Sequence, residues 1–148
     1  MAKTLLRIAF ADDDADDHLL FYKAIKTCYL SPIIDCFFNA DAMLDKFRRG
    51  NPVPHIIFLD KNMPGNYNYE CLAAIKGSGI LSAVPVIIYS TSDNAAEIAE
   101  ADQLGAAHFI TKPVRFQDTL TILCNTIHQF VPHELAVRCN TAVSPVCC

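Results

Sequence analysis

The sequence lacks an excess of basic residues. Twelve Lys and Arg side chains stand against sixteen Asp and Glu side chains, which gives a formal net charge of −4. A protein whose main role is to bind nucleic acid or an anionic membrane needs a positively charged surface. The composition therefore argues against both roles, and neither a nucleic-acid partner nor a membrane partner is expected.

Long hydrophobic runs are also missing. The longest charge-free apolar stretch, residues 77–92, is interrupted by Pro85 and is too short and too polar to cross a membrane. The start of the chain does not resemble a signal peptide, because only a short apolar run separates Lys3 from the acidic cluster that begins at Asp12. We therefore expect a cytoplasmic protein.

The seven cysteines lack the spacing of a metal or disulfide motif. No pair is arranged as Cys-x-x-Cys, and the first four lie within apolar patterns, where cysteine acts as a small hydrophobic residue. Neither a disulfide nor a zinc site is therefore expected. Cys147 and Cys148 are expected to be exposed thiols, and the sequence does not define their role.

What the sequence does contain is a regular alternation of two kinds of segment. The chain has 148 residues, 52% of them hydrophobic, which is enough for one domain with a substantial core. The expected strands are residues 5–11, 33–38, 56–59, 84–89 and 107–111, and the expected helices are residues 14–28, 41–49, 69–76, 94–104 and a last one from about 116. Five such alternations predict an α/β fold with a doubly wound parallel sheet. We expect the domain to span residues 1–130 and residues 131–148 to form a tail without an output domain.

Polar side chains follow four of the five predicted strands. Asp12 and Asp13 come after the first strand, Asp60 after the third, Ser90 after the fourth and Lys112 after the fifth. Because the C-terminal ends of parallel strands share one edge of the sheet, we expect these side chains to converge. Three adjacent carboxylates repel one another unless cations neutralise them. Lys112 and a divalent ion would do so, and Mg²⁺ or Mn²⁺ is expected because the ligands are all oxygens.

With these residues the chain resembles the receiver domain of two-component response regulators, of the stand-alone single-domain type. The matching pieces are the Asp12-Asp13 pair, Asp60 within Leu-Asp-Lys-Asn-Met-Pro-Gly, Ser90 after Pro-Val-Ile-Ile-Tyr, Gly105-Ala106, Phe109 and Lys112-Pro113. The resemblance covers residues 5 to about 129. It implies a flavodoxin-like (βα)5 fold with strand order 2-1-3-4-5.

The resemblance also implies a phosphorylation site. Asp60 would accept a phosphoryl group from a histidine kinase or a histidine phosphotransfer protein. Asp13, Asp60 and the backbone carbonyl of Asn62 would hold Mg²⁺ directly, and Asp12 would act on the ion through bound water. The domain would catalyse only its own phosphorylation and dephosphorylation, and in that sense it is not expected to be an enzyme.

A response to phosphorylation is implied as well. Ser90 and Lys112 would contact the phosphoryl group, and Phe109 would be the switch aromatic that responds to Ser90. Asn62 and Ser92 would set the lifetime of the phosphoryl group. The signal would pass to a downstream protein target, whereas the cognate kinase, the target and the oligomeric state are not defined by the sequence.

Two other functions stay open on the same fold. A haloacid-dehalogenase-like phosphatase also uses an Asp nucleophile at a strand end, but its second Asp, two residues later, is replaced here by Asn62. A flavin- or nucleotide-binding module needs a Gly- or Ser/Thr-rich phosphate loop after the first strand, where this chain has carboxylates. Both functions fit the sequence less well than a receiver domain does, and we keep them as alternatives.

Overall fold

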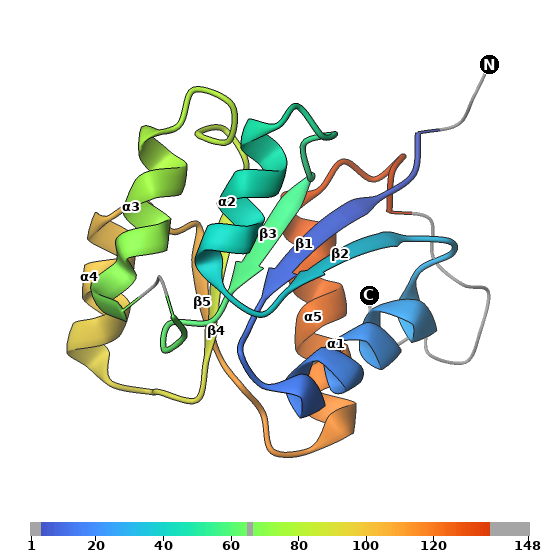
Figure 1. The fold of residues 1–148 in the computed structure, drawn as a ribbon. Helices are drawn as coiled ribbons and strands as arrows, with labels where there is room; N and C mark the ends of the chain where they lie inside the picture. Colours follow the sequence, from blue (N-terminus) through green and yellow to red (C-terminus); the bar gives the residue numbers. More distant parts are fainter. Residues whose placement is uncertain (1–3, 65–66, 137–148) are drawn as a thin grey trace.

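Five parallel strands form one sheet at the centre of the molecule (Figure 1). The structure is a computed structural model, and it describes residues 4–64 and 67–136. The strands are β1 (Arg7–Ala11), β2 (Ile33–Phe37), β3 (Ile56–Leu59), β4 (Val86–Ser90) and β5 (His108–Thr111). Their order is β2-β1-β3-β4-β5, and each neighbouring pair is parallel. The predicted flavodoxin-like sheet is therefore confirmed.

Five helices connect the strands. They are α1 (Ala15–Cys28), α2 (Ala40–Arg48), α3 (Glu70–Gly77), α4 (Ala95–Gln103) and α5 (Phe116–Phe130), with a short 3-10 turn at Tyr67–Tyr69 before α3. The predicted boundaries of β3 agree with the structure, and most of the others differ by one or two residues. β4, for example, begins after Pro85, because proline has no N–H to donate to the ladder, although its carbonyl accepts a hydrogen bond from Ile57.

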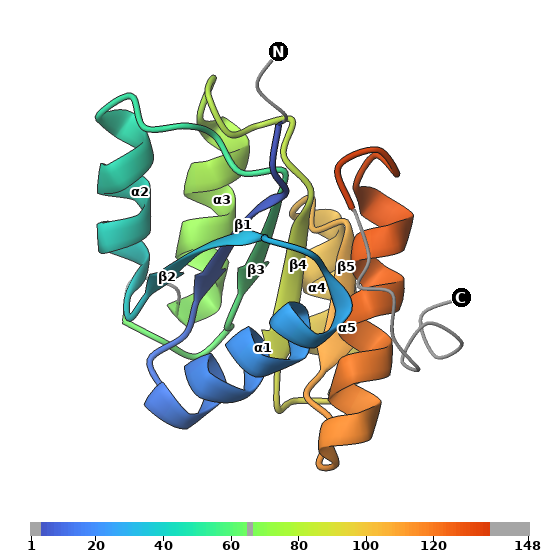
Figure 2. The same ribbon diagram turned by 90° about the vertical axis from the view of Figure 1, so that its right-hand side faces the viewer.

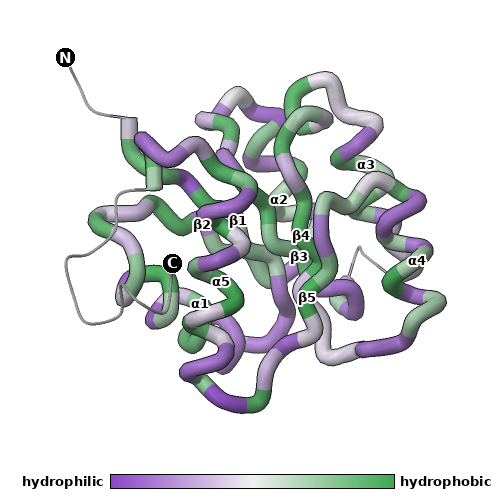
Figure 3. The backbone as a smooth tube through the Cα atoms, turned by 180° about the vertical axis from the view of Figure 1, so that it is seen from behind, coloured by the Kyte–Doolittle hydropathy of each residue, from purple (hydrophilic) through white to green (hydrophobic). Residues whose placement is uncertain are grey.

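The helices cover both faces of the sheet, α1 and α5 on one face and α2, α3 and α4 on the other (Figures 1 and 2). Within β3, Ile56 and Phe58 face the first layer, and Ile57 and Leu59 face the second. All four side chains are buried, which explains why this strand is marked by an unbroken apolar run. Figure 3 accordingly shows the central strands mainly in the hydrophobic colour.

The start of α1 is fixed by Asp14. The Asp14 side chain accepts a hydrogen bond from the backbone N–H of Asp16 (2.8 Å), so Asp14 is the N-cap of the helix. Asp16 and Asp17 occupy the first turn, where the helix dipole favours negative charge. The loop between β1 and α1 is therefore short, and it places the beginning of α1 beside the carboxyl end of the sheet.

A disulfide joins Cys28, the last residue of α1, to Cys124 in α5, with 6.4 Å between the two Cα atoms. We expected no disulfide from the sequence, and that prediction was wrong. Spacing rules detect cysteines that are close in sequence, whereas these two are 96 residues apart and meet because α1 packs against α5. Cys36 is exposed and Cys71 is buried, and Cys147 and Cys148 lie outside the described residues.

The packed part of the chain continues beyond α5. Val131 and Ala136 are buried in the core that α1 and α5 share, so the chain stays on the domain to the last residue described. The rest of the predicted tail, residues 137–148, lies outside the described residues, and the absence of an output domain stays a prediction. Within residues 4–64 and 67–136, no helix has the length and apolar character that crossing a membrane requires.

Candidate functional site

Three carboxylates meet at the carboxyl edge of the sheet. Ala11 of β1 pairs with Leu59 of β3, so the residues that follow them, Asp12 and Asp60, are neighbours. The backbone N–H of Asp60 donates to the Ala11 carbonyl (2.9 Å), which fixes this register one residue further. One oxygen from each of Asp12, Asp13 and Asp60 lies within 4.8 Å of the others. The structure therefore brings Asp12 and Asp13, which follow β1, together with Asp60, which follows β3.

Lys112 reaches this cluster from the end of β5. Its Nζ lies 2.6 Å from Asp12 Oδ2, 2.8 Å from Asp17 Oδ2 and 3.8 Å from Asp60 Oδ1. The side chain is only 9% exposed, so these carboxylates replace water around the ammonium group. Asp17 was not among the site residues predicted from the sequence, and its contact with Lys112 was missed.

Ser90 is held beside Lys112 by the sheet. Ser90 pairs with Thr111 at the end of the β4–β5 ladder, and the backbone N–H of Lys112 donates to the Ser90 carbonyl (2.6 Å). The Ser90 side chain is fully buried, and its Oγ accepts a hydrogen bond from the backbone N–H of Ser92 (3.3 Å). Its hydroxyl is thus placed at the same edge as the acids by the backbone alone.

Burial changes the protonation of the central acid. Removal from water raises the pKa of Asp60 from 3.8 to about 6. The Lys112 cation opposes this rise in pKa, whereas the negative charges of Asp12 and Asp13 add to it, and the backbone N–H of Asn62 lowers the pKa by donating to the carboxylate. A further positive charge beside Asp60 would therefore stabilise the ionised form of its carboxylate.

Asp12 and Lys112 form the tightest pair in the site. Burial raises the pKa of the Asp12 carboxyl, and the hydrogen bond from Lys112 is the largest of the effects that lower it. For Lys112, burial alone would lower the pKa, but the hydrogen bonds to Asp12 and Asp17 raise it above its ordinary value. Lys112 is therefore a cation throughout the physiological pH range.

The acids form a donor set suited to a divalent ion. Carboxylate oxygens are the ligands that Mg²⁺ and Mn²⁺ prefer, and one oxygen from each of Asp12, Asp13 and Asp60 lies within 4.8 Å of the other two. Asp12 already accepts hydrogen bonds on both oxygens, from Lys112 on Oδ2 and from the Asp14 N–H on Oδ1 (2.9 Å). Asp13 is exposed and has no such partner among the hydrogen bonds of the described residues. This difference fits a direct ligand role for Asp13 and an indirect one for Asp12.

A second polar group lies next to the site and was missed by the sequence analysis. The Ser92 hydroxyl donates to the Glu97 carboxylate of α4, and Lys61 Nζ lies 3.1 Å from the same carboxylate. The Thr111 hydroxyl donates to the Ser92 carbonyl (2.9 Å). Of the two predicted lifetime residues, Ser92 is therefore held by α4 and β5, whereas Asn62 is exposed to solvent.

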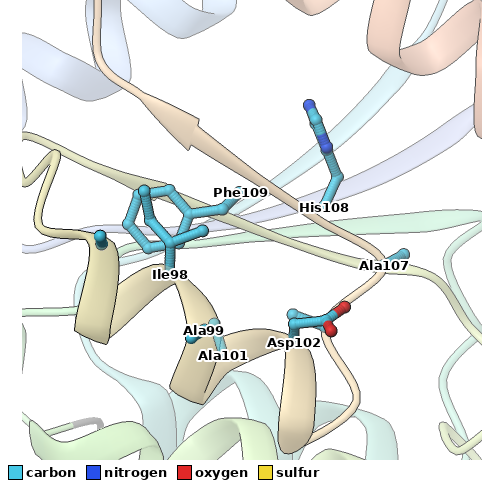
Figure 4. A pocket seen from close by; sticks show the side chains of 9 residues that line it. Ile98, Ala99, Ala101, Asp102, Ala107, His108 and Phe109 are labelled. Atoms are coloured by element: carbon cyan, nitrogen blue, oxygen red, sulfur yellow. The ribbon is translucent and has the colours of Figure 1, made fainter.

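Phe109, the predicted switch aromatic, borders a pocket of about 470 Å³ between α4 and β5. Figure 4 shows Ile98 and Phe109 at one end of this pocket and Asp102 towards the other. The helix side of the pocket is lined mainly by alanines, so little side-chain volume fills it. Phe109 is only partly buried, and it packs against the core on the α2–α4 face of the sheet.

Residues 8–123 match the family described as the response regulator receiver domain. Among curated proteins, the chain is 26% identical over 115 residues to the probable methanogenesis regulatory protein FilR2 of Methanothrix harundinacea, covering 75% of this chain and 74% of that protein. It is 30% identical over 79 residues to protein PilG of Pseudomonas aeruginosa, covering 53% of this chain and 58% of PilG. It is 37% identical over 86 residues to the two-component response regulator ARR7 of Arabidopsis thaliana, covering 58% of this chain and 39% of ARR7. The relatives thus include a plant protein, and they do not restrict the chain to bacteria.

Solved structures give the same result for the fold. The phosphorylated cyanobacterial phytochrome response regulator RcpA superposes with a TM-score of 0.79 at 23% identity, covering 86% of this chain and 94% of that one. The Mn²⁺-bound form of response regulator Rcp1 superposes with a TM-score of 0.74 at 23% identity, covering 86% of this chain and 99% of that one. At these identities the likeness shows a shared fold.

Proposed function

We propose, on the premise that this chain belongs to the response regulator receiver domain family, that Asp60 accepts a phosphoryl group in a Mg²⁺-dependent reaction. The phosphoryl donor would be a histidine kinase or a histidine phosphotransfer protein. The observation that carries this proposal is the meeting of Asp12, Asp13 and Asp60 within 4.8 Å, with Lys112 as their buried counter-charge. The Mn²⁺-bound and phosphorylated states of the similar structures support the same chemistry.

Asp60 acts as the nucleophile in this scheme. One of its carboxylate oxygens forms a bond to phosphorus while the bond between phosphorus and the donor's histidine nitrogen breaks. Asp13, Asp60 and the backbone carbonyl of Asn62 would hold Mg²⁺, which when bound supplies positive charge beside the transferred group. Lys112 stays cationic, and at 3.8 Å from Asp60 it needs to move only a short distance to contact a phosphoryl oxygen. The protein would catalyse only this reaction on itself and its own dephosphorylation, in which water attacks phosphorus, the bond to Asp60 breaks and inorganic phosphate leaves.

The output would follow from the new negative charge. A phosphoryl group adds close to two negative charges. The Ser90 hydroxyl accepts a hydrogen bond from the Ser92 N–H, and it can donate its own proton to one of the phosphoryl oxygens. Phe109 can then turn inward from the pocket edge. This shift between two packings would change the surface formed by α4, β5 and α5, to which a downstream protein target would bind.

Intact mass spectrometry tests the proposal directly. The parent protein, incubated with acetyl phosphate and Mg²⁺, should gain one phosphoryl group, an increase of about 80 Da. Asp60→Asn should gain none, whereas Asp45→Asn, an exposed acid of α2, is the matched control and should behave as the parent. Excess chelator should abolish the gain. A mass increase that persists in Asp60→Asn, or one that survives the chelator, contradicts the proposal.

The same preparation distinguishes the two alternative functions. Steady hydrolysis of p-nitrophenyl phosphate would indicate a phosphatase, but with Asn62 at the position of the second acid no sustained turnover is expected. Binding of a flavin is likewise not expected, because the loop after β1 presents carboxylates where a phosphate of the flavin nucleotide would lie. Location in the cytoplasm stays a prediction.

A further inference from the structure

Asp17, in the first turn of α1, forms an ion pair with Lys112 at the end of β5. Its carboxylate extends from the first turn of α1 to Lys112 Nζ, at 2.8 Å, and its side chain is 27% exposed. An ammonium group has three N–H donors, and Asp12 and Asp17 each accept one of them. Asp60 lies 3.8 Å away, beyond hydrogen-bond distance. In the resting protein Lys112 therefore contacts two acids, Asp12 and Asp17, that are not the proposed phosphoryl acceptor.

We propose that Asp17 is a positioning residue, which holds Lys112 away from Asp60 and so balances the affinity of the site for its metal ion against its affinity for a phosphoryl group. This inference rests on the proposed function of Asp60. The third N–H of Lys112 can reach a phosphoryl group on Asp60 only if Nζ moves from its present distance of 3.8 Å towards Asp60, and this movement lengthens the 2.8 Å contact with Asp17. Part of the favourable contact with the phosphoryl group is then offset by the weaker ion pair with Asp17. Asp17 thus acts on Asp60 only through Lys112.

The charges of the site predict the direction in which removal of Asp17 should change the binding of each ligand. With Asp17 included, the site combines the carboxylates of Asp12, Asp13, Asp17 and Asp60 with the ammonium group of Lys112, and this excess of negative charge attracts a divalent cation. The same excess repels a phosphoryl group, which carries close to two negative charges. Removing the charge of Asp17 should therefore weaken Mg²⁺ binding and strengthen the binding of an anion that mimics the phosphoryl group. A residue with only a structural role would weaken both.

The experiment compares Asp17→Asn with Asp16→Asn. Both residues lie in the first turn of α1, and both changes remove one negative charge, but the Asp16 side chain is exposed and forms no ion pair with the part of the chain that the structure describes. Calorimetric titration measures the dissociation constant for Mg²⁺ and, at saturating Mg²⁺, for beryllofluoride. Asp17→Asn should raise the dissociation constant for Mg²⁺ about fivefold and lower that for beryllofluoride about fivefold. Asp16→Asn should change either constant less than about twofold, because solvent and salt screen an exposed charge.

Two further measurements isolate the role of Lys112. In the metal-free protein, the ¹⁵N signal of the Lys112 side chain should shift in Asp17→Asn and not in Asp16→Asn, since only the first change removes a bonded partner. In a Lys112→Ala background, Asp17→Asn should no longer strengthen beryllofluoride binding beyond the effect of Asp16→Asn.

The outcomes that overturn the inference are distinct from those that overturn the proposed function. Equal effects of Asp17→Asn and Asp16→Asn, or weaker binding of both ligands in Asp17→Asn, contradict the positioning role while phosphorylation of Asp60 stands. A parent protein that binds no beryllofluoride and takes up no phosphoryl group contradicts the proposed function and this inference with it.

Discussion

The backbone N–H of Lys112 donates a hydrogen bond to the carbonyl oxygen of Ser90, with 2.6 Å between the two atoms. The two side chains proposed to contact the phosphoryl group are therefore joined through a single backbone hydrogen bond between β4 and β5. Phe109 lies in the same ladder, opposite Ile88 of β4. Movement of Ser90 towards a phosphoryl group should consequently be transmitted to β5 without a long chain of contacts.

Ser90→Ala should separate phosphorylation from the response. The variant keeps Asp60 and Lys112, so we expect it to accept a phosphoryl group, but it lacks the hydroxyl that would draw β4 inward. NMR should show that phosphorylation leaves the environment of Phe109 nearly unchanged. In the parent, phosphorylation is expected to strengthen partner binding by about 1–3 kcal/mol, and in Ser90→Ala most of this increase should be lost. Ser90→Thr, which keeps a hydroxyl, is the control. The same shifts around Phe109 in phosphorylated Ser90→Ala and in the phosphorylated parent would show that the coupling takes another route.

Substitution of Asn62 should change the lifetime of the phosphoryl group. Asn62 is exposed two residues after Asp60, where a side chain can block or guide the attacking water. Lys, Arg or Met at this position should change the rate of dephosphorylation about tenfold, which corresponds to about 1.4 kcal/mol of barrier. The decay of the phosphorylated mass with time measures this rate. Equal rates for the parent and all three variants would contradict the assignment of Asn62.

Reduction of the disulfide should lower the stability of the domain. The Cys28–Cys124 bond closes a loop of 96 residues between α1 and α5, so breaking it increases the conformational freedom of the unfolded chain. Urea unfolding with and without reductant should show a decrease of about 2–4 kcal/mol in the free energy of unfolding. Cys28→Ala should show no further decrease on reduction. An unchanged unfolding midpoint after complete reduction, verified by mass, would contradict this expectation.

His55 should make stability depend on pH. Its Nδ1 accepts a hydrogen bond from the backbone N–H of Arg7 (2.9 Å), and burial lowers its pKa below the ordinary value of 6.5. Between the lowered pKa and 6.5 the unfolded chain binds more protons than the folded one, so stability rises with pH. This contribution is complete above the unfolded pKa and is lost as the pH falls through the folded pKa.

Unfolding free energies measured between about pH 5 and pH 8 test this sign. His55→Asn keeps an acceptor near the position of Nδ1 but cannot take up a proton, so its stability should vary less over this range than that of the parent. Identical slopes in the two proteins would show that the pH dependence comes from other groups.

The fold and the centre of the site could be predicted because they depend on local patterns. The apolar run of β3 ends at Asp60, and a parallel sheet brings all such strand ends to one edge. Asp17 could not be predicted as a partner of Lys112, because Asp16 and Asp17 share the first turn of α1 and only the rotation of the helix decides which one faces the site. Glu97 was missed for the same reason, since its role depends on how α4 approaches Ser92.

The bond between Cys28 and Cys124 also changes the connectivity of the molecule. Strands β2 to β5 all lie between these two cysteines, so four of the five strands belong to one covalent ring, and β1 belongs to the segment that precedes it. A protease that cuts once within this ring, for example in the exposed loop at residues 51–53, would leave the two fragments attached to each other until a reductant is added. After such a cut, the fragment that contains β1 and β2 would stay covalently linked to the fragment that contains β3.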